Sequence, residues 1–220
     1  MIFKVKYSTD KDIQNHLKSS WKFSYSKFGR KNIKDKLLAS YPEDFKENLK
    51  KAKTPQEAEI VIGNFLSSLP KNFHNTTPLI ALGVEQTLNE NAHKIEDSLT
   101  SAYKKPVPFD KVTVYLTTCN IYPYNFKECW FMSSRNASAE GHIRIANHEL
   151  NHFMFYYYYP ELKKELGEKK YEILKEALAI FTNSEGNDKP EVKNLESYFR
   201  KNLSNTIEEV LKKNEWKRYF

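Results

Sequence analysis

The sequence predicts an α+β fold that is mainly helical, with a small mixed sheet. Helical periodicity with start and stop signals covers most of the chain. Only 6 of the 220 residues are glycine and 29% are charged, a composition that favours helices over a large β architecture. Three short segments, "IFKVKY", "KVTVYLTT" and "CWFMSS", are apolar and rich in strand-forming residues, and these should build the sheet.

The first elements are expected to be one strand followed by helices. Residues 2–7, "IFKVKY", alternate between polar and apolar side chains, which is typical of a strand. Residues 10–68 then follow a helical pattern. Within them Thr54 is a predicted N-cap, Pro55 occupies the first helical position, and Glu57 completes a capping box.

A second start signal, Thr77 followed by Pro78, predicts one long helix over residues 77–103. The segment "KKPVPF" then breaks the chain. We therefore expect two regions. Residues 1–105 would form a mostly helical cap or regulatory region, and residues 106–220 would form a core that holds the candidate site and ends in helices.

The second region begins with strands and continues with helices. Residues 111–118 and 129–134 are predicted strands that pair with each other, joined by a loop over residues 119–128. Residues 147–159 should be a helix that Pro160 closes.

The segments around that helix are less sharply defined. Residues 142–145, "HIRI", fit either a short strand or a helix start. Residues 161–183 predict one or two helices with Gly167 as a joint, and Pro190 opens helices that run to the end of the chain.

The formal net charge of +7 raises the question of an acidic partner. Lysines alternate with glutamates, as in "ELKKELGEKK", which indicates a solvated surface more than a one-sided basic stripe. Nucleic acid is therefore not the expected partner. A basic helical module that binds nucleic acid or an acidic protein, with a structural or vestigial metal site, stays open as the alternative function.

The location expected from the sequence is cytoplasmic. No apolar run approaches the roughly 18 residues of a membrane span, and the N-terminus does not resemble a signal peptide. Cys119 and Cys129 do not form a disulfide framework or a metal knuckle, so reduced thiols are the default. A single hairpin disulfide stays open if the protein were exported by another route. The oligomeric state is left undefined.

The stretch "HELNH" predicts a metal site. His148 and His152 are four residues apart, so a helix places both imidazoles on one face. Glu149 is rotated by about 100° and could reach a water on the metal without being a ligand. Random placement would produce this spacing with odds on the order of one in a hundred. Two neutral nitrogen ligands beside a carboxylate base are typical of zinc hydrolases.

A third ligand has several candidates. Glu176 lies in "YEILKEALAIF" on an apolar helix face, where a carboxylate is costly unless it is paired or binds a metal. Glu172 has charged neighbours and is expected on a solvated face. His142 stays open as a ligand from upstream, and pairing of Glu176 with a buried arginine such as Arg144 stays open as its structural role.

"HELNH" followed by "LKEALA" resembles the gluzincin metallopeptidases, which carry His-Glu-x-x-His and then a glutamate on a following helix. The resemblance covers roughly residues 111–183. It implies a zincin-like fold with the sheet next to the active-site helix, a Zn²⁺ cofactor and a peptide or protein substrate. By this resemblance His148, His152 and Glu176 are the zinc ligands and Glu149 is the catalytic base.

Two further expectations follow from the same resemblance. Peptide would bind as an extra strand along a sheet edge, which we expect to be residues 129–134. A second electrophile, a tyrosine or histidine, would stabilise the oxyanion, and Tyr198, Tyr171 and His142 are its candidates. Separately, Tyr156 and Tyr159 continue the helix face of His152, either as walls of the site or as core packing.

Overall fold

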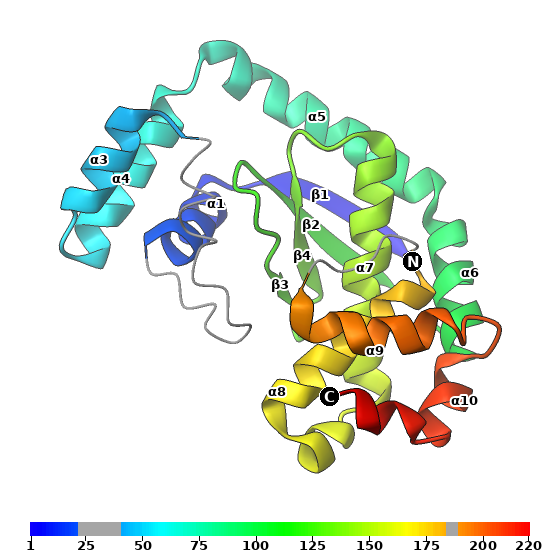
Figure 1. The fold of residues 1–220 in the computed structure, drawn as a ribbon. Coiled ribbons are helices and arrows are strands. Elements are labelled where there is room, and N and C mark those ends of the chain that lie inside the picture. The colour runs from blue at the N-terminus through cyan, green and yellow to red at the C-terminus, as the bar shows by residue number, and fades with distance from the viewer. Residues whose placement is uncertain (22–40, 184–188) are drawn as a thin grey trace.

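The computed structural model describes residues 1–21, 41–183 and 189–220 (Figure 1). Its centre is a four-stranded sheet in the order β1-β2-β4-β3. The strands are β1 (Ile2–Tyr7), β2 (Lys111–Thr117), β3 (Tyr124–Asn125) and β4 (Trp130–Ser134). β1, β2 and β4 are parallel to one another, whereas β3 runs antiparallel to β4. The predicted α+β class and the small mixed sheet are thereby confirmed.

Helices make up most of the rest of the described chain. Their bounds are α1 (Thr9–His16), α3 (Glu43–Lys51), α4 (Pro55–Ser68), α5 (Lys71–Glu90), α6 (Ala92–Tyr103), α7 (Ala139–Tyr158), α8 (Leu162–Leu178), α9 (Pro190–Arg200) and α10 (Ile207–Lys212). Shorter turns are η1 (Leu17–Trp21), η3 (Ala179–Phe181) and η4 (Glu215–Tyr219). None of these described helices combines the length and apolarity that crossing a bilayer requires.

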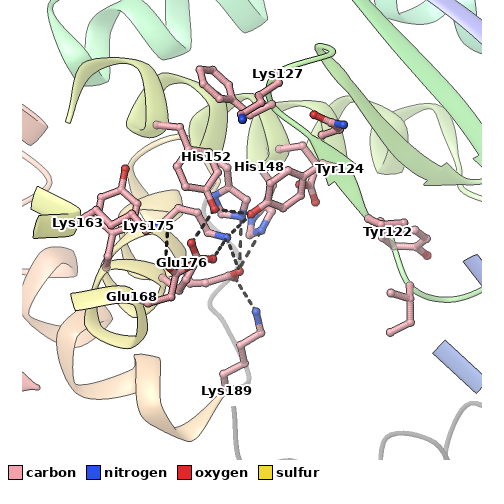
Figure 2. A pocket seen from close by; sticks show the side chains of 18 of the residues that line it. Tyr122, Tyr124, Lys127, His148, His152, Lys163, Glu168, Lys175, Glu176 and Lys189 are labelled. Carbon is pink, nitrogen blue, oxygen red and sulfur yellow. Dashed lines mark hydrogen bonds and ion pairs between the residues drawn. The ribbon is translucent and has the colours of Figure 1, made fainter. Parts of the chain in front are cut away.

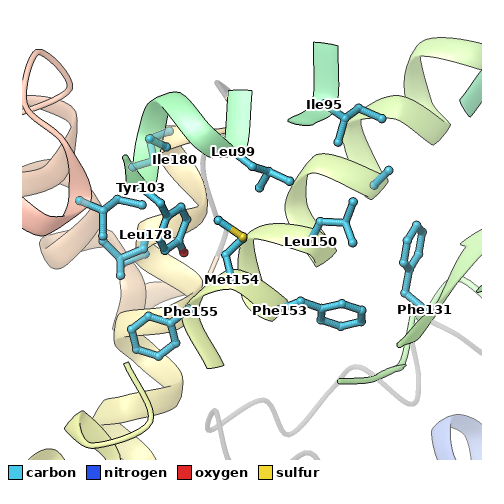
Figure 3. Close-up of a cluster of buried hydrophobic side chains, with 14 of the residues drawn as sticks. Ile95, Leu99, Tyr103, Phe131, Leu150, Phe153, Met154, Phe155, Leu178 and Ile180 are labelled. Atoms are coloured by element: carbon cyan, nitrogen blue, oxygen red, sulfur yellow. The ribbon is translucent and has the colours of Figure 1, made fainter. Parts of the chain in front are cut away.

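The main core lies between the sheet and α5, α6 and α7. Alternate residues of β2, namely Val112, Val114 and Leu116, are buried, as the period of two along a strand requires. Leu150 and Phe153 of α7 belong to the same buried cluster, which continues into α8, α9 and η3 (Figure 3). The core therefore fixes α7 firmly against the sheet.

A second, smaller hydrophobic cluster joins α3 and α4, and its buried members are Phe45, Leu49, Ala58, Ile62 and Leu66. In Figure 1 these two helices lie to one side of the sheet, beyond α1. β1, however, pairs with β2, and Phe3 shares the main core with residues after 110. The predicted division at residues 105 and 106 stays a prediction.

The predicted helix over residues 77–103 is wrong at both its start and its continuity. α5 already begins at Lys71 after Pro70, and Pro78 lies inside it. α5 ends at Glu90, and α6 starts at Ala92 after Asn91. Pro78 has no N–H to donate to the His74 carbonyl four residues earlier, and hydrogen bonds from side chains to the Phe73 carbonyl reinforce the turn before it.

Arg135, which follows β4, is central to that turn. Its Nε donates to Thr77 Oγ1 at 2.8 Å, and Thr77 Oγ1 donates to the Phe73 carbonyl at 2.6 Å. The Arg135 guanidinium also lies 4.2 Å from the centre of the Phe73 ring. These contacts come from a residue almost 60 positions away, so no local sequence pattern reveals them.

The start of α4 follows the prediction in part. Thr54 accepts a hydrogen bond from the Glu57 amide at 3.2 Å, and Pro55 occupies the first helical position. The Glu57 carboxylate, however, accepts from the Lys53 amide at 2.7 Å and so reaches one residue further back than in a capping box. Residues 22–40 of the predicted helical stretch lie outside the described residues.

Candidate metal centre

α7 carries the "HELNH" stretch in the middle of a 20-residue helix. The predicted start at residue 147 is too late, because Ser138 caps the helix by accepting from the Gly141 amide at 3.1 Å. "HIRI" is thereby helical. His148 and His152 lie one turn apart on the same face, with ring centroids separated by 4.4 Å.

α8 brings Glu176 to these two histidines. Its carboxylate oxygens lie 3.9 Å from His148 Nε2 and 3.8 Å from His152 Nε2. One ligand atom from each of the three residues lies within 4.8 Å of the others, a geometry that could hold a metal ion. Gly167, with φ of 75° and non-helical geometry, bends α8 at the predicted joint.

The protonation states of this cluster suit a divalent metal. Burial lowers the pKa of His148 to about 4 and lowers the pKa of His152 well below its usual value. Burial alone would raise the pKa of Glu176, but the positive charges of Lys175 and Lys189 hold that pKa well below its ordinary value. The cluster therefore offers two neutral imidazoles and one carboxylate, the His₂Glu donor set of catalytic zinc sites.

Glu149 is buried beside the three candidate ligands. Its Oε2 has no hydrogen-bond partner within the described part of the chain. Burial, followed by the charge of Glu176, raises the pKa of Glu149 to about 8. A buried carboxyl with a free oxygen and a pKa near neutrality can take up and release a proton.

Two cavities meet at these residues. The main cavity, of about 990 Å³, is lined by residues 120–127, by one face of α7, by Pro160, by α8 and by Lys189. The minor cavity, of about 420 Å³, lies between the end of β4 and the first half of α7. Tyr122, His148 and Glu149 line both cavities, so His148 and Glu149 are reached from two sides, whereas His152 and Glu176 line the main cavity.

Two lysines surround Glu176, and neither was expected from the sequence. Lys189 Nζ lies 2.8 Å from Glu176 Oε2, and Lys175 Nζ lies 3.3 Å from Glu176 Oε1. Arg144, the partner considered from the sequence, lines the minor cavity. The Lys175 side chain is only 2% exposed. Charge compensation for Glu176 therefore involves lysines close to it in the fold.

The expectation that Glu172 lies on a solvated face is wrong. Its carboxylate lines the main cavity, pairs with Lys175 Nζ at 3.0 Å and accepts from the Tyr156 hydroxyl at 2.9 Å. Lys175 follows Glu172 by three residues, so the two side chains share a helix face that turns inward. The charged residues near Glu172 in the sequence had indicated a solvated position instead.

A network of hydroxyl groups extends from Glu172 to the sheet edge. The Tyr156 hydroxyl lies 2.8 Å from that of Tyr124, and Lys175 Nζ donates to the Tyr124 oxygen at 2.5 Å. Burial raises the pKa of Tyr124. Tyr124 belongs to the segment predicted as a loop, and only its aromatic character was a signal of a role.

The other tyrosine and histidine candidates lie in different places. Tyr171 lines the main cavity. His142 Nδ1 lies 2.8 Å from the buried Ser133 hydroxyl, outside the candidate ligand cluster found among the described residues.

Tyr198 packs against Phe199 and Tyr219, and Tyr159 packs against Tyr103 and Phe155. Of the two tyrosines predicted from helix spacing, Tyr156 lines the main cavity and Tyr159 packs in the core.

The expectation that residues 129–134 form the sheet edge is wrong. β4 lies between β2 and β3, and Tyr124 and Asn125 of β3 pair with Phe131 and Trp130. The edge strand beside the main cavity is therefore β3 with its flanking residues. A two-residue strand has too little periodicity to be found from sequence.

Asn151, inside "HELNH", explains how α7 is held in place. The Tyr103 hydroxyl donates to the Asn151 carbonyl at 3.0 Å and to its Oδ1 at 3.1 Å. Asn151 Nδ2 donates to Thr182 Oγ1 at 3.0 Å. The side chain therefore links α7 to α6 and to the residue after η3.

Replacement of Asn151 by alanine should lower the free energy of unfolding by about 1–3 kcal/mol, because buried partners lose their hydrogen bonds. Urea unfolding monitored by circular dichroism measures this change. Asn194→Ala, at an exposed position of α9, controls for the change in helix propensity. Equal unfolding midpoints for the two variants would contradict the role assigned to Asn151.

Comparison with known proteins gives no relative: no protein-family model, curated protein or solved structure matches the chain. The site therefore has to be judged by its own geometry and chemistry.

Proposed function

We propose that the protein is a zinc-dependent metallopeptidase with a zincin-like fold, similar in its site to the gluzincins. One observation carries the proposal. His148, His152 and Glu176 converge within 4.8 Å at the junction of two cavities, and the buried Glu149 lies beside them. Three protein ligands with an accessible remaining side are typical of catalytic zinc sites.

The residues of the chain would divide the work as follows. His148 and His152 would hold zinc through Nε2, the atoms that face Glu176, and Glu176 would be the anionic ligand. Zinc bound there would act as a Lewis acid and lower the pKa of a coordinated water to about 7. Glu149 takes the proton of the attacking water and returns it to the leaving amine.

Residues 120–127 would hold the substrate. They line the main cavity along its length, include the edge strand β3, and share Tyr122 with the minor cavity. A peptide that pairs with the backbone of this edge would pass the ligand cluster with one side in each cavity. This placement takes over the role that the sequence assigned to residues 129–134.

Metal analysis and peptide-library cleavage test the proposal together. The purified protein should hold about one zinc per chain and cleave peptides, and a chelator should abolish cleavage until zinc is restored. A protein that binds no zinc and cleaves no peptide would contradict the proposal. Tight binding of nucleic acid by such a protein would support the basic binding module instead.

Lys189 provides an independent test of the metal. Its ammonium lies 2.8 Å from a carboxylate oxygen that the metal would need, so the positive charge opposes zinc binding. Lys189→Met should therefore bind zinc about tenfold more tightly. Competition with a chromophoric chelator measures the dissociation constant.

Lys193→Met, at an exposed position of α9, is the matched control and should leave zinc affinity unchanged. Weaker zinc binding by Lys189→Met would contradict the electrostatic argument and would mean that Lys189 mainly orients Glu176.

A further inference from the structure

Tyr124, on the edge strand β3, points toward the candidate ligands (Figure 2). Its ring centroid lies 5.6 Å from that of His152. Its hydroxyl oxygen is 2.5 Å from Lys175 Nζ, which is in turn 3.3 Å from Glu176 Oε1. A single ammonium group therefore bridges the phenol and a proposed zinc ligand.

Lys175 uses all of its donors in this arrangement. A lysine ammonium has three protons and no acceptor. Those of Lys175 face the Tyr124 oxygen, Glu172 Oε2 at 3.0 Å and Glu176 Oε1 at 3.3 Å. Its side chain is buried, so solvent does not compete for these contacts. Lys175 therefore has no proton left for a substrate atom, and its charge holds Tyr124 in place.

Tyr124 still has a proton to give. Its oxygen accepts from Lys175, so its own hydrogen points elsewhere. The neighbouring Tyr156 donates its single proton to Glu172 Oε1, so in the 2.8 Å contact between the two hydroxyls Tyr124 is the donor. The resting acceptor is thus a neutral oxygen. A hydrogen bond to an anionic oxygen is roughly twice as strong, so an oxyanion in the main cavity would attract this proton away from Tyr156.

We propose that Tyr124 donates a hydrogen bond to the oxyanion that develops on the substrate carbonyl, with Lys175 as the residue that positions the phenol. This inference rests on the proposed peptidase function. It places the second electrophile on the sheet edge, upstream of "HELNH", whereas the sequence pointed to Tyr198, Tyr171 or His142. No covalent bond to Tyr124 forms, and its proton stays on the phenol or is shared with the oxyanion.

Kinetics of Tyr124→Phe are the first test. Loss of one oxyanion donor should lower kcat by about 10²–10³-fold, whereas KM and zinc content change little. Tyr157→Phe is the matched control, since Tyr157 is exposed on α7 and lies outside the lining of both cavities. The control should cleave peptides at the wild-type rate.

A second test uses binding and needs no turnover. A phosphinic peptide carries a tetrahedral, anionic centre in place of the scissile bond, whereas a thiol peptide of the same sequence binds metal without an oxyanion. Tyr124→Phe should bind the phosphinic peptide about 10²-fold more weakly and the thiol peptide as tightly as wild type. A merely structural role for Tyr124 would weaken both.

The positioning role of Lys175 is tested in combination. Lys175→Met should lower the affinity for the phosphinic peptide relative to the thiol peptide in the wild-type background and leave this ratio nearly unchanged in the Tyr124→Phe background, because both changes act through the hydrogen bond from Tyr124 to the oxyanion. Additive losses would overturn the link between the two residues. The single variant Tyr124→Phe remains decisive if Lys175→Met fails to fold.

The outcomes separate this inference from the proposed function. Wild-type protein that cleaves peptides, together with Tyr124→Phe that keeps wild-type kcat and phosphinic affinity, would overturn the role of Tyr124 alone. Wild-type protein that binds neither zinc nor either inhibitor and cleaves nothing would overturn both.

Discussion

The variant Glu149→Gln should hydrolyse peptides about 10²–10⁴-fold more slowly than wild type, or more slowly still, because proton transfer contributes about this much to the rate. It should keep its zinc. Glu149 is buried, lines both cavities and presents an oxygen that lacks a hydrogen-bond partner among the described residues. It is not one of the three convergent ligands. Burial is the main cause, and the charge of Glu176 the second, that raises the pKa of Glu149 to about 8. A group that transfers protons works best when its pKa is near the working pH.

Three measurements on the same preparation distinguish chemistry from folding: zinc content, melting temperature and peptide hydrolysis. Glutamine keeps the size of the side chain and removes the base, so the first two should stay at wild-type values. Glu140→Gln is the control, since Glu140 is an exposed carboxylate in the first turn of α7. Hydrolysis by Glu149→Gln at the wild-type rate would contradict the assignment of Glu149 as the base and, with it, the proposed mechanism.

The cluster of His148, His152 and Glu176 was predictable because two local sequence patterns produce it. The spacing of His148 and His152 fixes a common helix face wherever that helix lies. Glu176 stood out because Ile173, Ala179 and Ile180 surround it at helical spacing, and all three are buried in the fold. The meeting of the histidine face with the Glu176 face depends on tertiary packing, and only the resemblance to a family of metallopeptidases predicted it.

The residues that surround this cluster were not predictable, because their contacts join parts of the chain that are distant in sequence. Glu172 was expected on a solvated face because of charged neighbours such as Lys175, yet the Lys175 ammonium donates to the hydroxyl of Tyr124, 51 positions earlier in the chain. Lys189 reaches Glu176 from the start of α9. Such contacts depend on how elements pack, and charge patterns along a helix carry no information about them.

The sheet shows the same limit. Three of its four strands, β1, β2 and β4, were predicted from composition and alternation, but the neighbours of a strand depend on topology. β4 pairs in parallel with β2, and the chain between them folds back as β3 to cover the other side of Trp130 and Phe131. An edge made of two residues has no pattern of its own, so the candidate substrate edge at residues 120–127 emerged only from the fold.

Glu176→Gln should bind zinc at least about 100-fold more weakly than wild type. Loss of a residue that merely supports a ligand costs about 10–100-fold in metal affinity, and a direct anionic ligand should cost more. A neutral amide is a poorer ligand for zinc. The change also leaves two positive charges, Lys175 and Lys189, beside the metal position without the carboxylate that now offsets them.

Dialysis against a chelator followed by metal analysis measures the loss, and the rise in melting temperature on adding zinc should shrink in parallel. Glu172→Gln is the matched control. Glu172 lies one turn earlier on α8, lines the same cavity and pairs with the same Lys175, but it is not one of the three convergent residues. It should therefore keep its zinc. If both variants lost zinc equally, or if neither did, the special position of Glu176 between His148 and His152 would have no chemical meaning, and the gluzincin-like assignment would fail.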